Sequence, residues 1–417
     1  MAEIINSFGL SNGDVLTAII TKDRFSQNTS YNFDTIRKFL DFPMITPRFR
    51  IYVLYSDETI NYEIPVEDIK LGGSYSENYQ NGQRRSLSFT LDNFSGKYTP
   101  NINTLWAGTR LRLDQGIEMY DGTTVWFYKG IYVISQITPS QSINEKTVQV
   151  SASDKFSLFE GRTGALESTF EIPVDSEIEK VIQDILLSDM GNGDPMDTKP
   201  IIYHESFKGK RTQATITKSA GETYGSILLE LATQLSAEIF YNSMGNLVLV
   251  PMSEILNDED KSIIYHYYSE KGDINGLNFT FDMNSIVNRV IVIGSSQTGG
   301  THHATAVNDD PASPLCYQRI GYRTGEIIND SNIYTDLLAQ ERAQYELRQK
   351  LILRSSTSVN VSFNPLLTVN NMITITDDFF NFSQERFLIQ SISTPLDYSG
   401  QSSISISNAR NLPFVVK

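Results

Sequence analysis

Two stretches of this chain, far apart in the sequence, follow the same pattern. Residues 132–139 read YVISQITP and residues 387–395 read FLIQSISTP, with one residue more before the second proline. Nine residues after each proline lies an alternating apolar segment, at Val148 in the first case and at Ile404 in the second. Alternation of this kind is typical of a strand with one buried face.

The similarity extends upstream of both stretches. The segment LWAGTRLRL at 105–113 is matched by LTVNNMITI at 367–375, with Leu111 standing where Ile373 stands. Three elements in the same order, at nearly the same spacing, indicate a β module that occurs twice in the chain.

The duplication predicts that residues 105–152 and 367–409 superpose as equivalent strands. Neighbouring segments support a β fold. Residues 86–91 (SLSFTL) alternate strictly between polar and apolar side chains, and residues 48–55 are apolar on both faces, as expected of a strand buried on both sides. Turn pairs such as Asp121-Gly122 separate the strands at short spacing, which favours a compact antiparallel barrel or sandwich.

The composition agrees with this fold class and excludes several functions. The 417 residues include 21 Tyr and 22 Phe, which favours sheet. A net charge of −15 without a basic stripe argues against binding to a nucleic-acid backbone. A single cysteine, Cys316, excludes an intramolecular disulfide framework. We find no apolar run long enough for a membrane span and no secretion signal, so we expect a soluble protein made in a cytoplasm.

The middle of the chain changes to a helical period. Residues 177–187 carry apolar side chains at helical spacing, with Asp175 or Ser176 as the expected N-cap. A second amphipathic helix is expected from Thr223, followed by a hairpin that turns at Gly245-Asn246. This pattern predicts a small α+β domain. Further along, residues 297–318 are expected to be a long exposed loop and residues 332–354 a helix.

We find no catalytic, cofactor or metal site in the sequence. His302 and His303 lie near Asp309 and Asp310, but adjacent residues project in different directions and metal-ligating helical spacing is lacking. Cys316 has no nucleophile motif around it. The glycines form no phosphate-binding loop, and the acidic runs lack the EF-hand spacing. We therefore interpret these residues as loop and turn residues.

One segment carries a resemblance to a known family. It is LDNFSGKYTPN at 91–101, followed by WAGTRLRL and then by WFYKGIYVISQI. The α+β region with ETYGSILLELATQLSAEIFYNSMGNLVLVP and the strand NRVIVIG come next. This order of segments, over roughly residues 48–410, resembles the baseplate-hub or tail-tip hub proteins of tailed bacteriophages and contractile injection systems. The most specific positions are Leu91, Asn93, Gly96, Tyr98 and Pro100.

The resemblance implies a mainly β fold with an α+β insertion, in which each chain holds two tail-tube-like β-barrels. On this basis we expect four regions: an N-terminal arm at 1–46, a first barrel at 47–158, the α+β domain at 159–260, and a second barrel at 261–417 that includes the loop 297–318 and the helix 332–354.

The resemblance also implies an assembly and a place in the virion. Three chains would form a homotrimeric ring of six barrels at the tail tip, which joins a six-fold tail tube to a three-fold spike or fibre. DNA would pass through the ring, and the negative charge fits a channel that does not bind phosphate. Partners would be a tail-tube or distal tail protein above, a spike or fibre protein below, and the tape-measure protein. The chain would be assembled in the host cytoplasm, and any wall cleavage would belong to a partner.

Two other classes of function remain open from the sequence. A receptor- or carbohydrate-binding tail protein could use Trp106 and Trp126 to stack on sugars, although their positions in or beside strands favour core packing. A cell-wall hydrolase would need a carboxylate pair, and the 49 acidic residues allow many. None of these lies in a distinctive motif.

Overall fold

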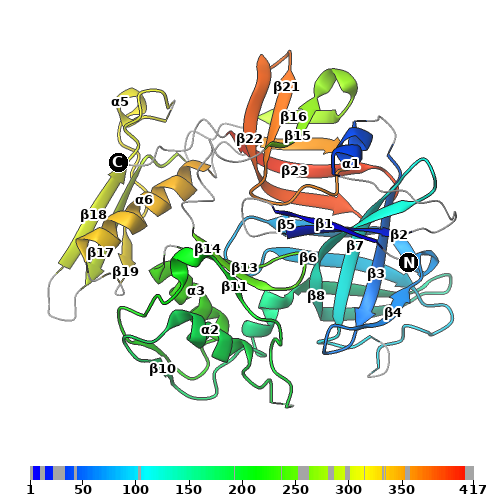
Figure 1. The fold of residues 1–417 in the computed structure, drawn as a ribbon, viewed down its shortest axis with the longest axis horizontal. Coiled ribbons are helices and arrows are strands. Elements are labelled where there is room, and N and C mark those ends of the chain that lie inside the picture. The colour runs from blue at the N-terminus through cyan, green and yellow to red at the C-terminus, as the bar shows by residue number, and fades with distance from the viewer. Residues whose placement is uncertain are drawn as a thin grey trace.

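The protein is described by a computed structural model in which one continuous sheet of 15 strands runs through the two β regions (Figure 1). The structure describes residues 3–9, 15–21, 33–41, 45–101, 105–191, 193–235, 237–251, 263–279, 286–295, 301–313, 315–330, 333, 335–352 and 357–408. Strands make up 46% of the chain and helices 18%, which confirms the mainly β class.

The first half of the sheet has the strand order β4-β3-β7-β8-β9-β6-β5. Its strands are β3 (Pro47–Leu54), β4 (Ile60–Ile64), β5 (Ile69–Asn78), β6 (Arg85–Asp92), β7 (Arg110–Glu118), β8 (Thr124–Gln141) and β9 (Lys146–Asp154). Within residues 1–46, β1 (Glu3–Gly9) pairs with β2 (Val15–Thr21), which pairs with β8, and α1 (Phe33–Leu40) buries Ile36 in the core. This part of the expected arm therefore adds strands to the sheet.

The second half of the sheet repeats this arrangement with β16-β20-β23-β22-β21-β15. Its strands are β15 (Ile263–Tyr268), β16 (Ile274–Phe279), β20 (Thr357–Ser362), β21 (Met372–Asp377), β22 (Phe382–Pro395) and β23 (Gln401–Asn408). One difference is that β15 runs parallel to β21, whereas β3 runs antiparallel to β7. Both halves share a single apolar core.

The registers of the long strands β8 and β22 bear out the duplication. Leu111 lies opposite Tyr132, and Ile373 lies opposite Phe387, so the upstream match is in register. Each long strand pairs with the preceding strand through its first part and with the following strand through its last part. Both also carry a bulge directly after an isoleucine, at Ser135 and at Gln390.

The downstream part of the match needs a correction of two residues. Ile137 lies opposite Val150, and its counterpart Ile392 lies opposite Ile404. Val150, rather than Val148, is therefore the structural equivalent of Ile404. Counting nine residues from each proline gives the wrong equivalence, because the second stretch has one residue more before its proline and because the turns that follow differ in length.

An α+β unit with its own core follows the first half of the sheet. It contains β10 (Phe170–Ile172), α2 (Ile178–Leu186), β11 (Ile202–Tyr203), β12 (Ile216–Lys218), α3 (Tyr224–Gln234), β13 (Ala237–Tyr241) and β14 (Leu247–Pro251). Thr223 caps α3 by accepting a hydrogen bond from the Ser226 amide at 3.2 Å. The N-cap of α2 is Glu177 rather than Asp175 or Ser176. Short 3-10 helices η1 (Val66–Asp68), η2 (Lys155–Phe159), η3 (Glu205–Phe207) and η4 (Ser269–Lys271) lie at connections.

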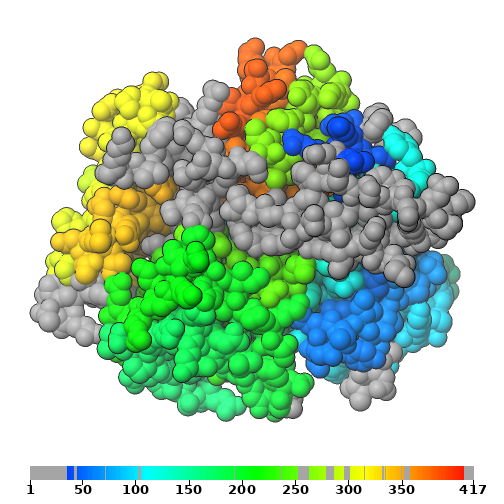
Figure 2. Space-filling model, in the orientation of Figure 1, coloured from blue at the N-terminus to red at the C-terminus, as the bar shows by residue number. Residues whose placement is uncertain are grey.

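A further small unit corrects the expectation of a long loop at 297–318. It contains β17 (Arg289–Ser295), β18 (Thr301–Val307), α5 (Tyr317–Ile320), β19 (Ile328–Asp330) and α6 (Asp336–Ile352). Strand β17 lies between β18 and β19, and α6 packs on them around a separate apolar core. In Figure 2 this unit, coloured yellow and orange, lies beside the green α+β unit.

Candidate assembly site

The two halves of the sheet meet where the last part of β22 pairs with β5. Ser391 lies opposite Asn78 and Pro395 lies opposite Ser74, in antiparallel register. Main-chain hydrogen bonds close both ends of this joint, from the Tyr79 amide to the Gln390 carbonyl at 2.8 Å and from the Leu396 amide to the Gly73 carbonyl at 2.8 Å. The joint thus connects one β module to the other within a single chain.

Among the described residues, two strand edges that correspond to this joint have no strand partner on one side. The last part of β8, from Gln136 to Gln141, pairs with β9 on one side, and no described strand pairs with its other side. At the far end of the sheet, β16 pairs with β20 and with no other described strand. By the duplication, β8 corresponds to β22 and β16 corresponds to β5. The chain therefore presents both halves of a second joint, one on β8 and the other on β16.

The register of such a second joint follows from the observed pairings. Phe279 corresponds to Tyr75, because Phe279 lies opposite Thr357 and Tyr75 lies opposite Leu87, which hold equivalent places. Transferring the internal register places Ser140 opposite Asn278, as Pro395 lies opposite Ser74. The β8 edge is exposed from Ser135 to Gln141 except at Ile137, so it is accessible to another chain.

Pro139 sets the β8 edge apart from its internal counterpart. It holds the place of Thr394. The Leu396 amide donates to Gly73 on β5, and every second amide along a strand points the same way, so the Thr394 amide also points toward β5. Proline has no N–H, so a joint made by β8 has one donor fewer than the internal joint. Prolines on open edges also limit unspecific strand addition.

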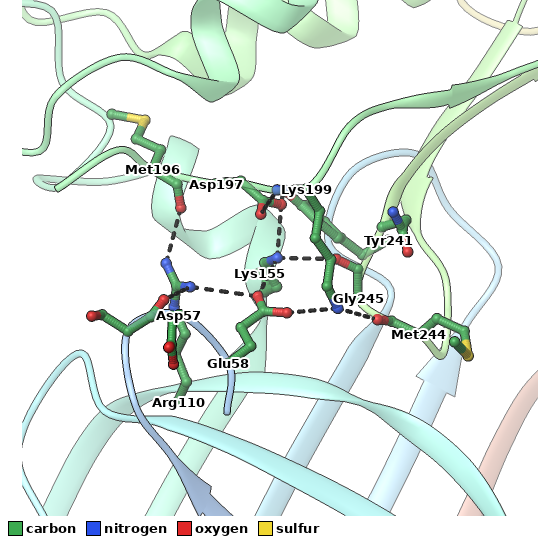
Figure 3. A network of polar contacts seen from close by, with 12 residues as sticks. Asp57, Glu58, Arg110, Lys155, Met196, Asp197, Lys199, Tyr241, Met244 and Gly245 are labelled. Atoms are coloured by element: carbon green, nitrogen blue, oxygen red, sulfur yellow. Dashed lines mark hydrogen bonds and ion pairs between the residues drawn. The ribbon is translucent and has the colours of Figure 1, made fainter. Parts of the chain in front are cut away.

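A buried ionic network fixes the α+β unit onto the first half of the sheet (Figure 3). Lys155, fully buried, lies 2.5 Å from Glu58 and 2.7 Å from Asp197, and donates to the Gly245 carbonyl at 3.0 Å. Glu58 comes from the turn between β3 and β4 and also contacts Lys199 at 2.6 Å. Arg110 on β7 donates to the Met196 carbonyl at 3.1 Å. The network thus joins two separate segments of the α+β unit, residues 196–199 and Gly245, to the sheet.

In this network the attraction between opposite charges opposes the cost of burying them away from water. Burial acts to raise the pKa of Glu58, but Lys155 and Lys199 outweigh it and hold that pKa below its usual value. Burial lowers the pKa of Lys155, against the opposing effect of Asp197 and Glu58. Sequence pattern alone does not assemble this cluster, because its members are far apart along the chain and meet only in the fold. The charge of Lys155 within the segment SDKFSLF is the one local hint.

The residues that the sequence analysis considered for chemistry do not come together in one site. His302 and His303 are neighbours on β18, and His302 Nδ1 lies 2.9 Å from Asp336 Oδ1. Asp310 accepts from the Ala312 amide at 2.9 Å, as in a turn, and Cys316 is buried. Across the described ranges, no group of three or more His, Cys, Asp or Glu residues is placed to hold a metal ion.

The two tryptophans do not form a common sugar-binding surface. Trp126 is buried on β8, with Arg50 stacked 4.2 Å from the ring centre, whereas Trp106 is 50% exposed in the connection before β7. In the part of the chain that the structure describes, no helix is long and apolar enough to cross a membrane.

A cleft lies between the α+β unit and α6. One cavity of about 210 Å³ is lined by Glu230, Gln234, Arg342 and Tyr345, among others, and a larger hollow adjoins it. Arg342 is held by Glu346 at 2.8 Å. The lining brings two separate units of the chain together.

Comparison with known proteins identifies the fold. No protein-family model matches the sequence, and a search of curated proteins finds no significant match. Among solved structures, the chain is similar to the 43 kDa tail protein of prophage MuSo2 from Shewanella oneidensis, with 16% identity, a TM-score of 0.56 and coverage of 87% of this chain and 99% of that one.

Two further structures agree. The tail protein from Neisseria meningitidis MC58 gives 12% identity and a TM-score of 0.57, over 87% of this chain and 99% of that one. A Francisella PdpA-VgrG complex chain gives 9% identity and a TM-score of 0.53, over 90% of this chain and 54% of that one. The chain has the fold of phage tail proteins and VgrG-related proteins, which confirms at the level of fold the resemblance seen in the sequence.

Proposed function

We propose that this chain is a non-enzymatic structural protein of a phage tail tip, and that three copies form a ring of six β modules. The observation that carries the proposal is the pair of open edges on β8 and β16. These edges correspond to the two strands that form the joint between modules inside the chain. A ring closes if each chain's β8 pairs with β16 of the next chain, in the manner of the internal joint.

A trimer is the ring size that fits a duplicated chain in a six-fold tail. Each chain supplies two modules, so three chains present six similar positions to a hexameric tube and three identical ones to a spike or fibre. The phage tail proteins that share this fold support a place in the virion, with a tube or distal tail protein above and a spike protein below. DNA would pass through the ring during ejection.

The size of the particle in solution tests the proposal. We expect light scattering and negative-stain images to show trimeric rings at high protein concentration, in equilibrium with the free chain. Because Pro139 removes a donor from each joint between chains, these joints are weaker than the internal joint and the trimer dissociates on dilution. Particles that remain monomeric at all concentrations, alone and with a tube protein, would contradict it.

A further inference from the structure

The cleft between the α+β unit and α6 extends beyond the cavity of about 210 Å³. The adjoining hollow measures about 660 Å³, which is within the size range of ligand sites in proteins. The two spaces share part of their lining and therefore form one continuous cleft, and the residues common to both are Gln213, Gln234, Leu338 and Tyr345. None of the described residues that line the cleft belongs to β8 or β16. The cleft is thus independent of the joints between chains.

Helix α6 has two distinct faces, and one of them forms a wall of this cleft. Ala339, Ala343 and Leu347, spaced four residues apart, are buried in the core that α6 shares with β17 and β18. The residues of α6 that line the cleft follow a second stripe at helical spacing, made of Leu338, Glu341, Arg342, Tyr345 and Arg348. The core on the first face therefore fixes the direction of the second.

Arg348 is a cation without a partner in this wall. Its side chain is partly buried, and within the described parts of the chain no hydrogen bond or ion pair engages it. Burial lowers the pKa of its guanidinium, and no described carboxylate opposes this effect. By contrast, Arg342 on the same stripe is paired with Glu346 at 2.8 Å. Burying an unpaired charge is unfavourable, so Arg348 is poised for an anionic group from outside the chain.

The opposite wall of the hollow adds positive charge. Lys210 and Arg211 line it from the α+β unit, and Arg211 is paired at 3.3 Å with Asp175, whose side chain is exposed. Glu341 is the one carboxylate among the described residues that line the hollow. Together with Arg348, three cations thus face one carboxylate, in a chain whose net charge is −15. The hollow is locally positive, which is the reverse of the chain as a whole.

The remaining lining combines apolar side chains with side-chain amides. Apolar contacts come from Phe207, Leu235 and Leu337. Both amide atoms of Gln234, the last residue of α3, are buried and have no hydrogen-bond partner among the described residues. A side-chain amide offers a donor and an acceptor, as a peptide group does. Three glutamines contribute such amides to the hollow, Gln213, Gln234 and Gln344.

We propose that this cleft binds a short peptide segment of a partner protein, in which an acidic side chain lies beside apolar ones. The carboxylate accepts hydrogen bonds from Arg348, because the planar guanidinium matches a carboxylate at two points. Apolar side chains of the segment cover Leu235 and Leu337, and the glutamine amides pair with its main chain. A volume of about 660 Å³ with an apolar lining exceeds what a compact inorganic anion fills. The positive charge selects an acidic segment over a neutral or basic one.

Selection of displayed random peptides on the immobilised full chain tests the proposal. We expect enriched sequences to carry Asp or Glu beside Leu, Ile or Phe, and the enrichment to be lost on Arg348→Glu. An enriched peptide is then labelled with fluorescein, and its dissociation constant is measured by anisotropy. Arg348→Gln should weaken binding by about 10- to 100-fold, the range for one hydrogen bond to a charged group. Amidation of the acidic side chain in the peptide should cost as much in the parent chain and little more in Arg348→Gln.

The control variant is Lys350→Gln, which removes the same charge from an exposed position of α6 outside the cleft lining. Its affinity for the peptide should change by less than about twofold, because an exposed charge away from the site is screened by solvent and salt. Arg348→Gln should also leave Tm unchanged or raise it, because no described partner is lost and a partly buried cation is removed. A lower Tm with unchanged peptide affinity would assign Arg348 a structural role instead.

Three further results would overturn the inference. Enrichment of basic or neutral peptides, or no enrichment above that on the Arg348→Glu chain, would show that the cleft does not select an acidic segment. Binding of inorganic phosphate or ATP that is lost in Arg348→Gln, with no peptide enriched, would assign the cleft to a phosphate-bearing ligand. Equal losses of affinity in Arg348→Gln and Lys350→Gln would place the peptide outside the cleft.

Discussion

Replacing Lys155 by methionine should destabilise this chain strongly. The ammonium group is fully buried and touches two carboxylates, Glu58 at 2.5 Å and Asp197 at 2.7 Å. Methionine fills a similar volume but leaves both carboxylates with less neutralisation in a dry site. Removing one partner of a buried ion pair costs about 3–5 kcal/mol. We expect a loss of that size in the free energy of unfolding by urea.

A matched control separates burial from charge. Lys97 pairs with Asp68 at 2.8 Å, but its side chain is half exposed, so Lys97→Met should cost about 1 kcal/mol or less. Adding Asp197→Asn to Lys155→Met should recover part of the loss, because the stranded charge is removed. If Lys155→Met costs no more than Lys97→Met, the network does not hold the α+β unit to the sheet.

The pH dependence of the same variant carries a definite sign. In the parent protein the pKa of Glu58 is held low, so its contribution is present above the unfolded pKa and is lost as pH falls. In Lys155→Met, burial without the lysine favours the protonated carboxyl. The deficit of the variant should therefore shrink on acidification from pH 7 toward pH 5, as followed by urea unfolding at each pH. A deficit that grows on acidification would contradict the assignment.

Three further predictions concern separate parts of the fold. Burial raises the pKa of Asp154 to about 6, against the opposing hydrogen bonds from the backbone amides of Arg85 and Arg84. Its contribution to stability should therefore be greatest below pH 4 and fall by on the order of 3 kcal/mol up to pH 6, a slope that Asp154→Asn should abolish. Gly245→Ala should destabilise by about 1–2 kcal/mol in thermal unfolding, because φ is +77° and the new Cβ would lie 2.6 Å from Ile131; an unchanged Tm would contradict this. Pro139→Thr should restore a donor to each joint between chains and stabilise the trimer by about 1 kcal/mol per joint, which lowers its dissociation constant in dilution experiments. Weaker assembly would argue against β8 as the strand that joins the chains.

Local pattern predicted the elements whose side chains alternate between water and one core. Strands such as β6 could be predicted because Leu87, Phe89 and Leu91 all face the shared core. Strand β18 could not, because its buried residues Ala304 and Ala306 are small and lie among polar ones. Its place in a sheet depends on β17 and α6, which cover it.

Only part of the assembly site could be predicted from the sequence. The pattern shared by the two long strands indicated two modules, and the turn residues indicated where strands end. The joint between β22 and β5 is a pairing of residues far apart in sequence, so no local pattern encodes it.

Disulfide formation between Ser140→Cys and Asn278→Cys tests the central claim most directly. The internal counterpart, Pro395→Cys with Ser74→Cys, is the matched control, because that pair lies opposite in the same chain and antiparallel neighbours fall within disulfide range. Cys316 is buried and gives no background. On mild oxidation, the control pair should close within one chain, and the test pair should give covalent trimers with each single variant unlinked. Failure of the test pair to link chains, at concentrations where the control pair closes fully, would contradict the ring.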